Sequence, residues 1–193
     1  MLFRSNSNNI SGSTQTVSLS GTGSSSTPAA TYIGLDTTTL GIWTGHYGSD
    51  GWAIAKETTS NPSYATLSFT GDTQYLNGAS STTPSALQVS SGSSTQAISC
   101  YYSTNSFDIN VDITDGNTHQ VALYLFNCTN SARMETISIL NASTNAVLST
   151  QTFSGFTSGE YAIWNVQGNV IIKVAFDSGP NAIVDGIFFD PAS

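Results

Sequence analysis

The stretch FDINVDITDGNTHQVALYLF, residues 107–126, decides the fold class that this sequence predicts. From 107 to 113 apolar and polar residues alternate, which is the period of a strand with one buried face. The turn-forming residues Asp-Gly-Asn follow at 115–117, and residues 120–126 are apolar on both faces, as in the central strand of a sheet. Together the two segments predict an antiparallel hairpin.

Strand-sized apolar runs continue on both sides of this stretch, separated by turn-forming residues. On the C-terminal side we expect strands at 134–140 and 146–153 joined by the turn-like residues 141–145, then strands at 160–166 and 170–176 joined by Gln-Gly-Asn, and a last strand at 182–189. On the N-terminal side we expect strands at 32–35, 52–55, 64–70 and 97–102, and a long loop or irregular edge at 80–95. No apolar pattern of helical period runs for ten residues. About ten short strands with polar turns predict an all-β fold, an antiparallel jelly-roll β-sandwich.

Residues 1–30 form a separate N-terminal segment ahead of the domain predicted at 31–193. Almost all of 5–30 are Ser, Asn, Gly and Thr, except for a short strand predicted at 14–20, TQTVSLS, which a flexible linker follows at 21–30. The context SGSTQTVSLSGTG is similar to the closing strand of immunoglobulin-like repeats in large bacterial surface proteins. Four interpretations stay open: a disordered tail, the remnant of a preceding domain, a strand that folds back on its own domain, or a strand donated to the sheet edge of the next subunit.

The composition argues against nucleic acid and membranes as partners. Only 8% of the residues are charged, against about 25% in an ordinary soluble protein, so the surface must be mostly hydroxyl and amide. Twelve acids outnumber four dispersed cations, Arg4, Lys56, Arg133 and Lys173, and the formal net charge is −8. Four scattered cations cannot form a basic patch, and the longest apolar runs are strand-sized, too short to span a bilayer.

Low charge with abundant Ser and Thr favours a secreted or cell-surface protein. The first four residues lead straight into polar sequence without the apolar region of a secretory signal, so either a leader has been removed or the chain is a piece of a longer one. Cys100 and Cys128 each lie at or just beyond a predicted strand. Two interpretations stay open: a disulfide between neighbouring strands, or two small buried thiols. Glycosylation sequons begin at Asn9, Asn127 and Asn141, although such triplets are frequent by chance in this composition.

The candidate binding site is the glycine-rich stretch DTTTLGIWTGHYGSDGW, residues 36–52, which holds two of the three tryptophans and one of the two histidines. Glycines let such a loop fold tightly and give rigid aromatic rings a fixed frame. Sugars stack on exposed rings beside hydroxyl and amide groups. We therefore predict a glycan or polysaccharide site formed by Trp43, His46, Tyr47 and Trp52. The alternative is that at least one of these tryptophans packs in the core.

Four aspartates predict a calcium site, because the excess of acids leaves carboxylates without basic partners. Asp36 and Asp50 bracket the glycine-rich loop, and Asp185 and Asp190 lie in or just after the last predicted strand. The first and last strands of a jelly roll commonly lie close together, so these carboxylates are expected to converge and supply the oxygen ligands that Ca²⁺ prefers. The alternative is that Asp36 and Asp50 bond their own backbone as turn residues.

Several of these stretches together resemble a known kind of module: DTTTLGIWTGHYGSDGW, NPSYATLSFTG, the run from ISCYY to VALYLF, and the end from ISILNAS to IFFDP. Residues 31–191 look like the jelly-roll, galactose-binding-like carbohydrate-binding modules and lectins of large secreted bacterial proteins. That resemblance implies a structural Ca²⁺ and sugar binding by loop aromatics. One departure is Asn-Cys-Thr at 127–129, where related modules carry an acidic pair around a tryptophan.

The sequence offers no catalytic constellation, and we expect a non-enzyme. There is no G-x-S-x-G elbow, two histidines are too few for a histidine-rich zinc site, and the cysteines lack metal-ligand spacing. The first hypothesis is an extracellular, calcium-stabilised, lectin-like domain that acts in adhesion or matrix through glycan contact. The second is a structural subunit of an extracellular filament, a homo-polymer assembled by donation of strand 14–20.

Overall fold

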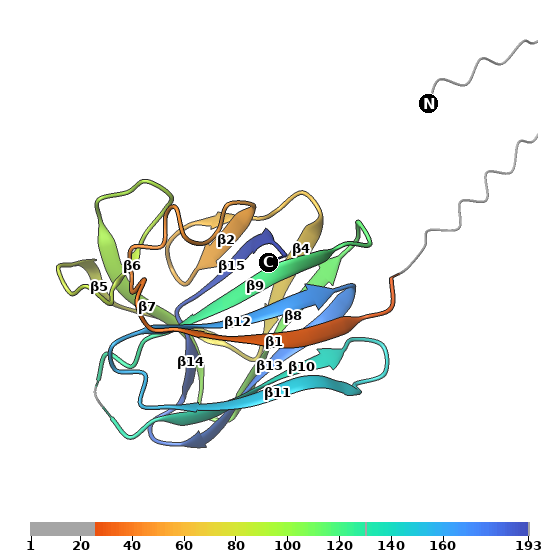
Figure 1. Ribbon diagram of the computed structural model, residues 1–193. Coiled ribbons are helices and arrows are strands. Elements are labelled where there is room, and N and C mark those ends of the chain that lie inside the picture. Colours follow the sequence, from red (N-terminus) through yellow and green to blue (C-terminus); the bar gives the residue numbers. More distant parts are fainter. Residues whose placement is uncertain (1–25, 130, 193) are drawn as a thin grey trace, which may run out of the picture.

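The structure is a computed structural model and describes residues 26–129 and 131–192. Within these ranges the chain forms β-strands and no helix (Figure 1). The strand predicted at 14–20 and the sequon at Asn9 lie outside the described residues, so strand donation stays a prediction.

Two large antiparallel sheets and one smaller sheet account for the strands. The six-stranded sheet has the order β1 (Ala29–Asp36), β12 (Glu160–Gln167), β9 (Thr118–Leu125), β15 (Gly186–Pro191), β2 (Gly51–Ile54) and β3 (Thr59–Ser60). The five-stranded sheet has the order β11 (Val147–Ser154), β10 (Met134–Asn141), β13 (Asn169–Ser178), β8 (Ser106–Ile113) and β4 (Ala65–Thr70). The third sheet has the order β14 (Ala182–Val184), β7 (Gln96–Ser103) and β5 (Thr73–Ser81), and β6 (Leu87–Gln88) also pairs with β7.

The main core fills the space between the two large sheets. Alternate residues of β8, such as Phe107 and Ile109, face it from one side, and alternate residues of β9, such as Val121 and Leu123, face it from the other. All four side chains are at most 1% exposed. This arrangement confirms the all-β antiparallel sandwich that the sequence predicts, while its finer jelly-roll assignment stays a prediction.

The hairpin predicted over 107–126 is wrong, although both of its strands form. β8 pairs with β13 and β4 in one sheet, while β9 pairs with β12 and β15 in the other. Residues 114–117 therefore cross from one layer to the next instead of reversing the chain within a sheet. Two-residue periodicity reports which face of a strand is buried, and two strands that bury their faces against each other across a core give the same pattern as a hairpin.

The two other predicted turns join their strands in different ways. Residues 141–145 close a hairpin, because β10 and β11 are hydrogen-bonded neighbours. The connection at 167–169 passes between sheets, since β12 and β13 belong to different layers.

β9 is a central strand buried on both faces, as its composition predicts. Its inward residues join the main core, and its outward residues Ala122 and Tyr124 join a second apolar cluster with Trp43, Tyr161 and Phe188. This second cluster lies on the other face of the six-stranded sheet. The glycine-rich loop contributes Trp43 and Tyr47 to it, so this loop covers the outer face of the sheet.

The third sheet contains the largest departures from the predicted strands. The run 182–189, predicted as one strand, divides at Asp185 into β14 and β15, which belong to different sheets. β5 was not predicted, because its sequence TQYLNGASS is mostly polar, and it forms an exposed edge strand. β6 lies inside the region predicted as a loop or irregular edge.

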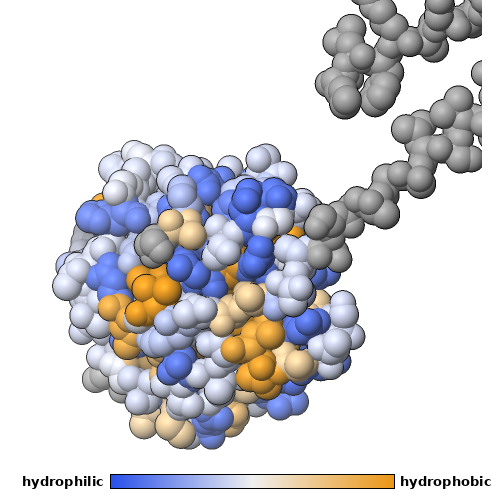
Figure 2. All heavy atoms as spheres, turned by 45° about the vertical axis from the view of Figure 1, so that its right-hand side comes forward, coloured by the Kyte–Doolittle hydropathy of each residue, from blue (hydrophilic) through white to orange (hydrophobic). Residues whose placement is uncertain are grey.

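The surface is mainly hydrophilic, with small separate apolar patches on the face that Figure 2 shows. The large apolar side chains that are most exposed are scattered over several elements: Ile33, Leu35, Ile42, Tyr75, Leu76, Met134 and Val147. The described residues contain no helix of the length and hydropathy needed to cross a bilayer.

Truncating Ile109, one of the core side chains of β8, tests the assignment of the core between the two large sheets. We expect Ile109→Ala to lower the free energy of unfolding by about 2–5 kcal/mol, because Ile109 is fully buried between the sheets. Ile33→Ala, at a residue that is 47% exposed, is the matched control and should change it by at most about 0.5 kcal/mol. Urea unfolding followed by tryptophan fluorescence measures both. Equal effects of the two substitutions would contradict the assigned core.

Candidate functional site

The glycine-rich loop begins at Asp36, whose carboxylate organises the first turn. Its Oδ1 accepts hydrogen bonds from the backbone N–H of Thr38 at 2.8 Å and of Thr39 at 3.2 Å. Its Oδ2 accepts the hydroxyl of Tyr47 at 2.9 Å. Partial burial alone would raise the pKa of Asp36, but hydrogen bonds from Thr38, Thr39 and Tyr47 outweigh it and hold this pKa well below its usual range. The carboxylate thus acts as an ionised anchor for the loop.

The middle of the loop is fixed to the last strand by Asp190. The carboxylate of Asp190 accepts the backbone N–H of Gly48 at 2.9 Å and of Ser49 at 2.8 Å. Gly48 has a φ of +72°, and a Cβ at this position would meet the rings of Trp43 and Phe188 at 3.0–3.2 Å. Only glycine satisfies both the left-handed backbone and the close approach to these rings.

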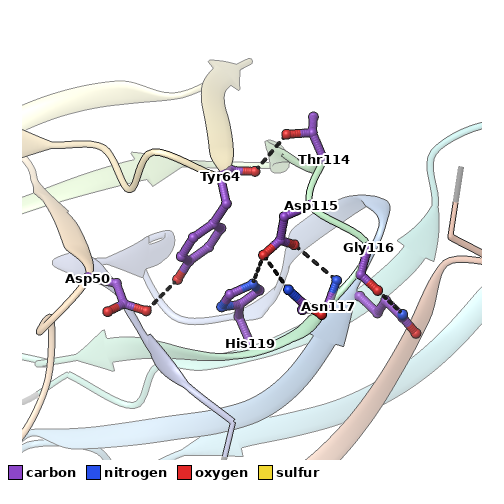
Figure 3. Close-up of polar contacts among 8 residues, drawn as sticks. Asp50, Tyr64, Thr114, Asp115, Gly116, Asn117 and His119 are labelled. Carbon is purple, nitrogen blue, oxygen red and sulfur yellow. Dashed lines mark hydrogen bonds and ion pairs between the residues drawn. The ribbon is translucent and has the colours of Figure 1, made fainter. Parts of the chain in front are cut away.

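The end of the loop is held by Asp50, whose carboxylate faces the hydroxyl of Tyr64, the residue just before β4 (Figure 3). Asp50 Oδ2 accepts the hydroxyl of Tyr64 at 2.9 Å. The ring of Tyr64 stacks on His119 with centroids 3.5 Å apart, and His119 Nε2 lies 3.0 Å from Asp115 Oδ2. Burial first, and then the hydrogen bond to Asp50, raise the pKa of Tyr64 above its usual value. This chain of contacts ties the loop to the crossing segment 114–117.

A cavity of about 350 Å³, which we call the loop cavity, opens at this loop. Residues 44–49 line it together with Trp52, Ser91 and Asp190. The ring of Trp52 is half-buried, packs 5.0 Å from the ring of Trp43, and donates its Nε1–H to Thr58 Oγ1 at 3.0 Å. His46 and Ser91 are exposed. The cavity therefore combines a fixed indole with an imidazole and several hydroxyl groups.

Three of the four predicted ligand residues line this cavity: His46, Tyr47 and Trp52. Trp43 does not, because it is 1% exposed and packs beneath Trp52 in the second cluster. Its Nε1–H donates to the backbone oxygen of Gln88 at 2.7 Å, which satisfies its one polar group inside the core. Trp43 is thus the tryptophan of the loop that packs in the core, which was the alternative interpretation of the sequence.

The four predicted calcium ligands are divided among separate places. Asp36 and Asp190 hold the loop, and Asp50 faces Tyr64. Asp185 is buried between β14 and β15, where its Oδ2 accepts the backbone N–H of Phe126 at 2.8 Å. Within 26–129 and 131–192, no three His, Cys, Asp or Glu side chains gather in a way that could hold a metal ion. These four residues as arranged do not form a shared coordination sphere, and the calcium ion stays a prediction.

The cysteines and two sequons also have defined surroundings. Cys100 and Cys128 are both thiols in the structure. Asn127 is 1% exposed, donates to the backbone oxygen of Ser131 and accepts from Arg133, so its amide has no room for a glycan in the folded domain. Asn141 caps the β10–β11 turn by accepting the backbone N–H of Ser143.

The sequence did not point to the hydroxyl residues of the loop cavity. Thr44 and Ser49 belong to the predicted loop, but Ser91 comes from the stretch expected to be a long loop at 80–95. Gln88 joins the two segments, because its Oε1 accepts the Thr44 hydroxyl at 2.8 Å. A single serine in a serine-rich chain carries no signal that would single it out.

Comparisons with known proteins add only remote likenesses. No protein-family model matches the sequence, and no curated protein matches it. Among solved structures, a family 35 carbohydrate-binding module from Clostridium thermocellum is similar over 73% of this chain and 98% of its own, with 14% identity and a TM-score of 0.38. The K1 cleaved adhesin domain of Lys-gingipain from Porphyromonas gingivalis W83 is similar over 74% of this chain and 98% of its own, with 9% identity and a TM-score of 0.40.

The pH dependence of stability tests the anchoring role of Asp36. The pKa of Asp36 is lower in the folded chain than in the unfolded chain, so its contribution is complete above the unfolded value of about 4 and is lost as the pH falls through the folded value. We expect Asp36→Asn to lower the Tm at pH 7 and the difference from the parent protein to shrink at pH 2.5. Thermal unfolding at both pH values measures this.

Asp72→Asn is the matched control for this experiment. Asp72 lies in the turn before β5, and its carboxylate accepts no hydrogen bond within the described part of the chain. This substitution should leave the Tm unchanged at pH 7. A Tm difference for Asp36→Asn that is as large at pH 2.5 as at pH 7 would show that the ionised carboxylate is not the anchor.

Proposed function

We propose that this domain is an extracellular glycan-binding module that holds one or two sugar units in the loop cavity and acts in adhesion or matrix. The observation that carries the proposal is the convergence of Trp52 and His46 with the hydroxyls of Thr44, Ser49 and Ser91 around one cavity. A volume of about 350 Å³ falls in the range of small-ligand sites, roughly 300 to 1,000 Å³.

Sugar rings present an apolar C–H face and a rim of hydroxyls, and the loop cavity has a group for each. The half-buried indole of Trp52 offers a flat apolar surface. His46 and the hydroxyls of Ser49 and Ser91 offer donors and acceptors, and the hydroxyl of Thr44, which donates to Gln88, offers a remaining acceptor. This mixture favours a neutral polar ligand over an apolar one or an ion.

The cavity is also held in place before any ligand enters. Asp190 fixes the backbone of residues 48 and 49, and Gln88 fixes Thr44 from the other side. Trp52 cannot rotate freely, because its indole N–H is bonded and its ring packs on Trp43. A site that is already ordered spends little binding free energy on ordering.

The low charge of the chain is consistent with a role outside the cell. With 8% charged residues the surface is mostly hydroxyl and amide, groups that hydrogen-bond to polysaccharides without ionic attraction. We propose binding and no catalysis, because the carboxylate that lines the cavity, Asp190, is committed to two backbone N–H groups and is not placed to act as a base.

A glycan array with two cavity variants tests the proposal. The parent protein should bind one class of neutral glycan, and His46→Ala should weaken that binding at least tenfold by removing an exposed hydrogen-bonding ring. Ser91→Trp should abolish it, because a large side chain on the exposed rim fills the cavity. Both positions are exposed, so unchanged Tm values are expected and confirm that the fold is intact.

The matched control is Tyr75→Leu, at an exposed tyrosine outside the loop cavity. It should leave glycan binding unchanged. Glycan binding that survives Ser91→Trp would place the glycan elsewhere on the domain, and silence of the parent protein across a broad array would reject the proposed function.

A further inference from the structure

A second cavity, which we call the sheet cavity, lies on the third sheet and shares no lining residue with the loop cavity. It measures about 490 Å³. In the strand register Tyr75 is paired with Cys100, and Ile183 is paired with Tyr102, so these four side chains lie on the same face of the sheet. That face forms one wall, and the segment that follows β9 forms another through Phe126 and Cys128.

The walls of the sheet cavity are mostly apolar and partly aromatic. Ile98 and Ile183 contribute aliphatic surface, and Tyr75, Tyr102 and Phe126 contribute rings. Tyr75 is 53% exposed at the edge strand β5, so one of the rings stands at the mouth. A cavity of this size and lining accepts a compact ligand with an apolar body.

Two carboxyl groups lie at or behind this cavity, those of Asp185 and Glu135, and neither has an ion-pair partner among the described residues. Asp185 lines it and receives the backbone N–H of Phe126, but no lysine, arginine or histidine nitrogen of the described residues lies within ion-pair distance of its carboxylate. Behind the wall lies the fully buried Glu135, whose Oε2 accepts the backbone N–H of Ile183. Its Oε1 has no hydrogen-bond partner among the described residues.

Arg133 is the cationic residue that lines the cavity, and its nitrogens are already occupied. Nε donates to the backbone oxygen of Asn181 at 2.9 Å, Nη1 to Asn127 Oδ1 at 2.7 Å and Nη2 to Asn181 Oδ1 at 2.8 Å. The side chain is 5% exposed. Three of the five N–H donors of Arg133 are therefore used to hold the cavity wall.

We propose that the sheet cavity binds a compact organic cation, an alkylammonium group on an apolar body. The aliphatic wall takes the body, the faces of Tyr75 and Tyr102 attract the cation through their ring quadrupoles, and Asp185 supplies the opposite charge. The nitrogens of Arg133 donate to neutral acceptors, so the carboxylate of Asp185 has no cation paired with it among the described residues. Burial raises the pKa of Asp185 well above its usual range, and an ammonium group bound beside it would favour the ionised form.

Three molecules of one shape and different charge test this assignment: cyclohexylammonium, cyclohexanol and cyclohexanecarboxylate. Titration followed by ¹H–¹⁵N NMR should move the amide signals of Tyr102 and Ile183. We expect cyclohexylammonium to bind at least tenfold more tightly than cyclohexanol, and cyclohexanecarboxylate to bind most weakly. Equal or tighter binding of the alcohol, tightest binding of the carboxylate, or no shift with 20 mM cyclohexylammonium would each overturn the proposal.

Two variants separate the ring and charge contributions. Tyr75→Leu keeps apolar surface at an exposed position but removes the ring, so it should weaken cyclohexylammonium at least threefold and cyclohexanol less than twofold. Asp185→Asn keeps an acceptor for the N–H of Phe126 but removes the charge, so it should abolish the preference for the ammonium over the alcohol. His46→Ala, in the loop cavity, should change neither affinity. A preference that persists in Asp185→Asn would show that this carboxylate is not the source of selectivity.

Discussion

The arrangement of this domain depends on one constraint: the six-stranded sheet is apolar on both faces. In β9 the residues with odd numbers, such as Leu123, face the core between the sheets, and those with even numbers, such as Tyr124, face outward. Phe188 of β15 and Tyr161 of β12 add to the outward face. Since the five-stranded sheet can cover only one side, another part of the chain must remove this second face from water. The glycine-rich loop does so with Trp43 and Tyr47, which means that the loop is part of the folded core before it is part of a site.

This dual role explains how a loop so far from regular structure can hold a defined cavity. The buried rings fix the loop from below. Asp36 holds its start through Tyr47, Asp190 holds its middle through the N–H groups of 48 and 49, and Asp50 holds its end through Tyr64. With twelve acids and four basic residues, the chain has too few cations to pair its carboxylates. It pairs them with hydroxyl and backbone donors instead, and the described residues contain a single ion pair, between His119 and Asp115. Acids that suggest a metal site in the sequence serve here as hydrogen-bond anchors.

The sequence specifies the strands of this fold much better than their partners. Alternation at 107–113 and the apolar run at 120–126 mark two real strands, but each pattern reports only burial, and burial is the same for neighbours in one sheet and for strands that face each other across a core. The loop 36–52 could be predicted as the site because it concentrates glycines and aromatics. The sequence could not show which rings of the loop would be buried. That depends on the outward face of β9 and β15, which no local pattern reveals. Ser91 and the edge strand β5 had no distinguishing signal, because serine, threonine and asparagine occur throughout the chain.

The change of sheet at Asp185 shows how the two cavities arise from one topological feature. The apolar run 182–189 is long enough for one strand, yet the backbone N–H of Asp185 bonds to Tyr124 and its oxygen accepts from Ala55, so the chain is held at the junction of two sheets. Beyond the junction β15 continues to Asp190, which anchors the glycine-rich loop and lines the loop cavity. Before it, β14 joins β7 in the third sheet, whose outward face forms the sheet cavity. A strand that stayed in one sheet would leave β7 without this neighbour and would remove the carboxylate of Asp185 from the cavity wall. The division of this last apolar run therefore places one aspartate in a hydroxyl-rich cavity and another in an aromatic one, which gives the two cavities their different chemistry.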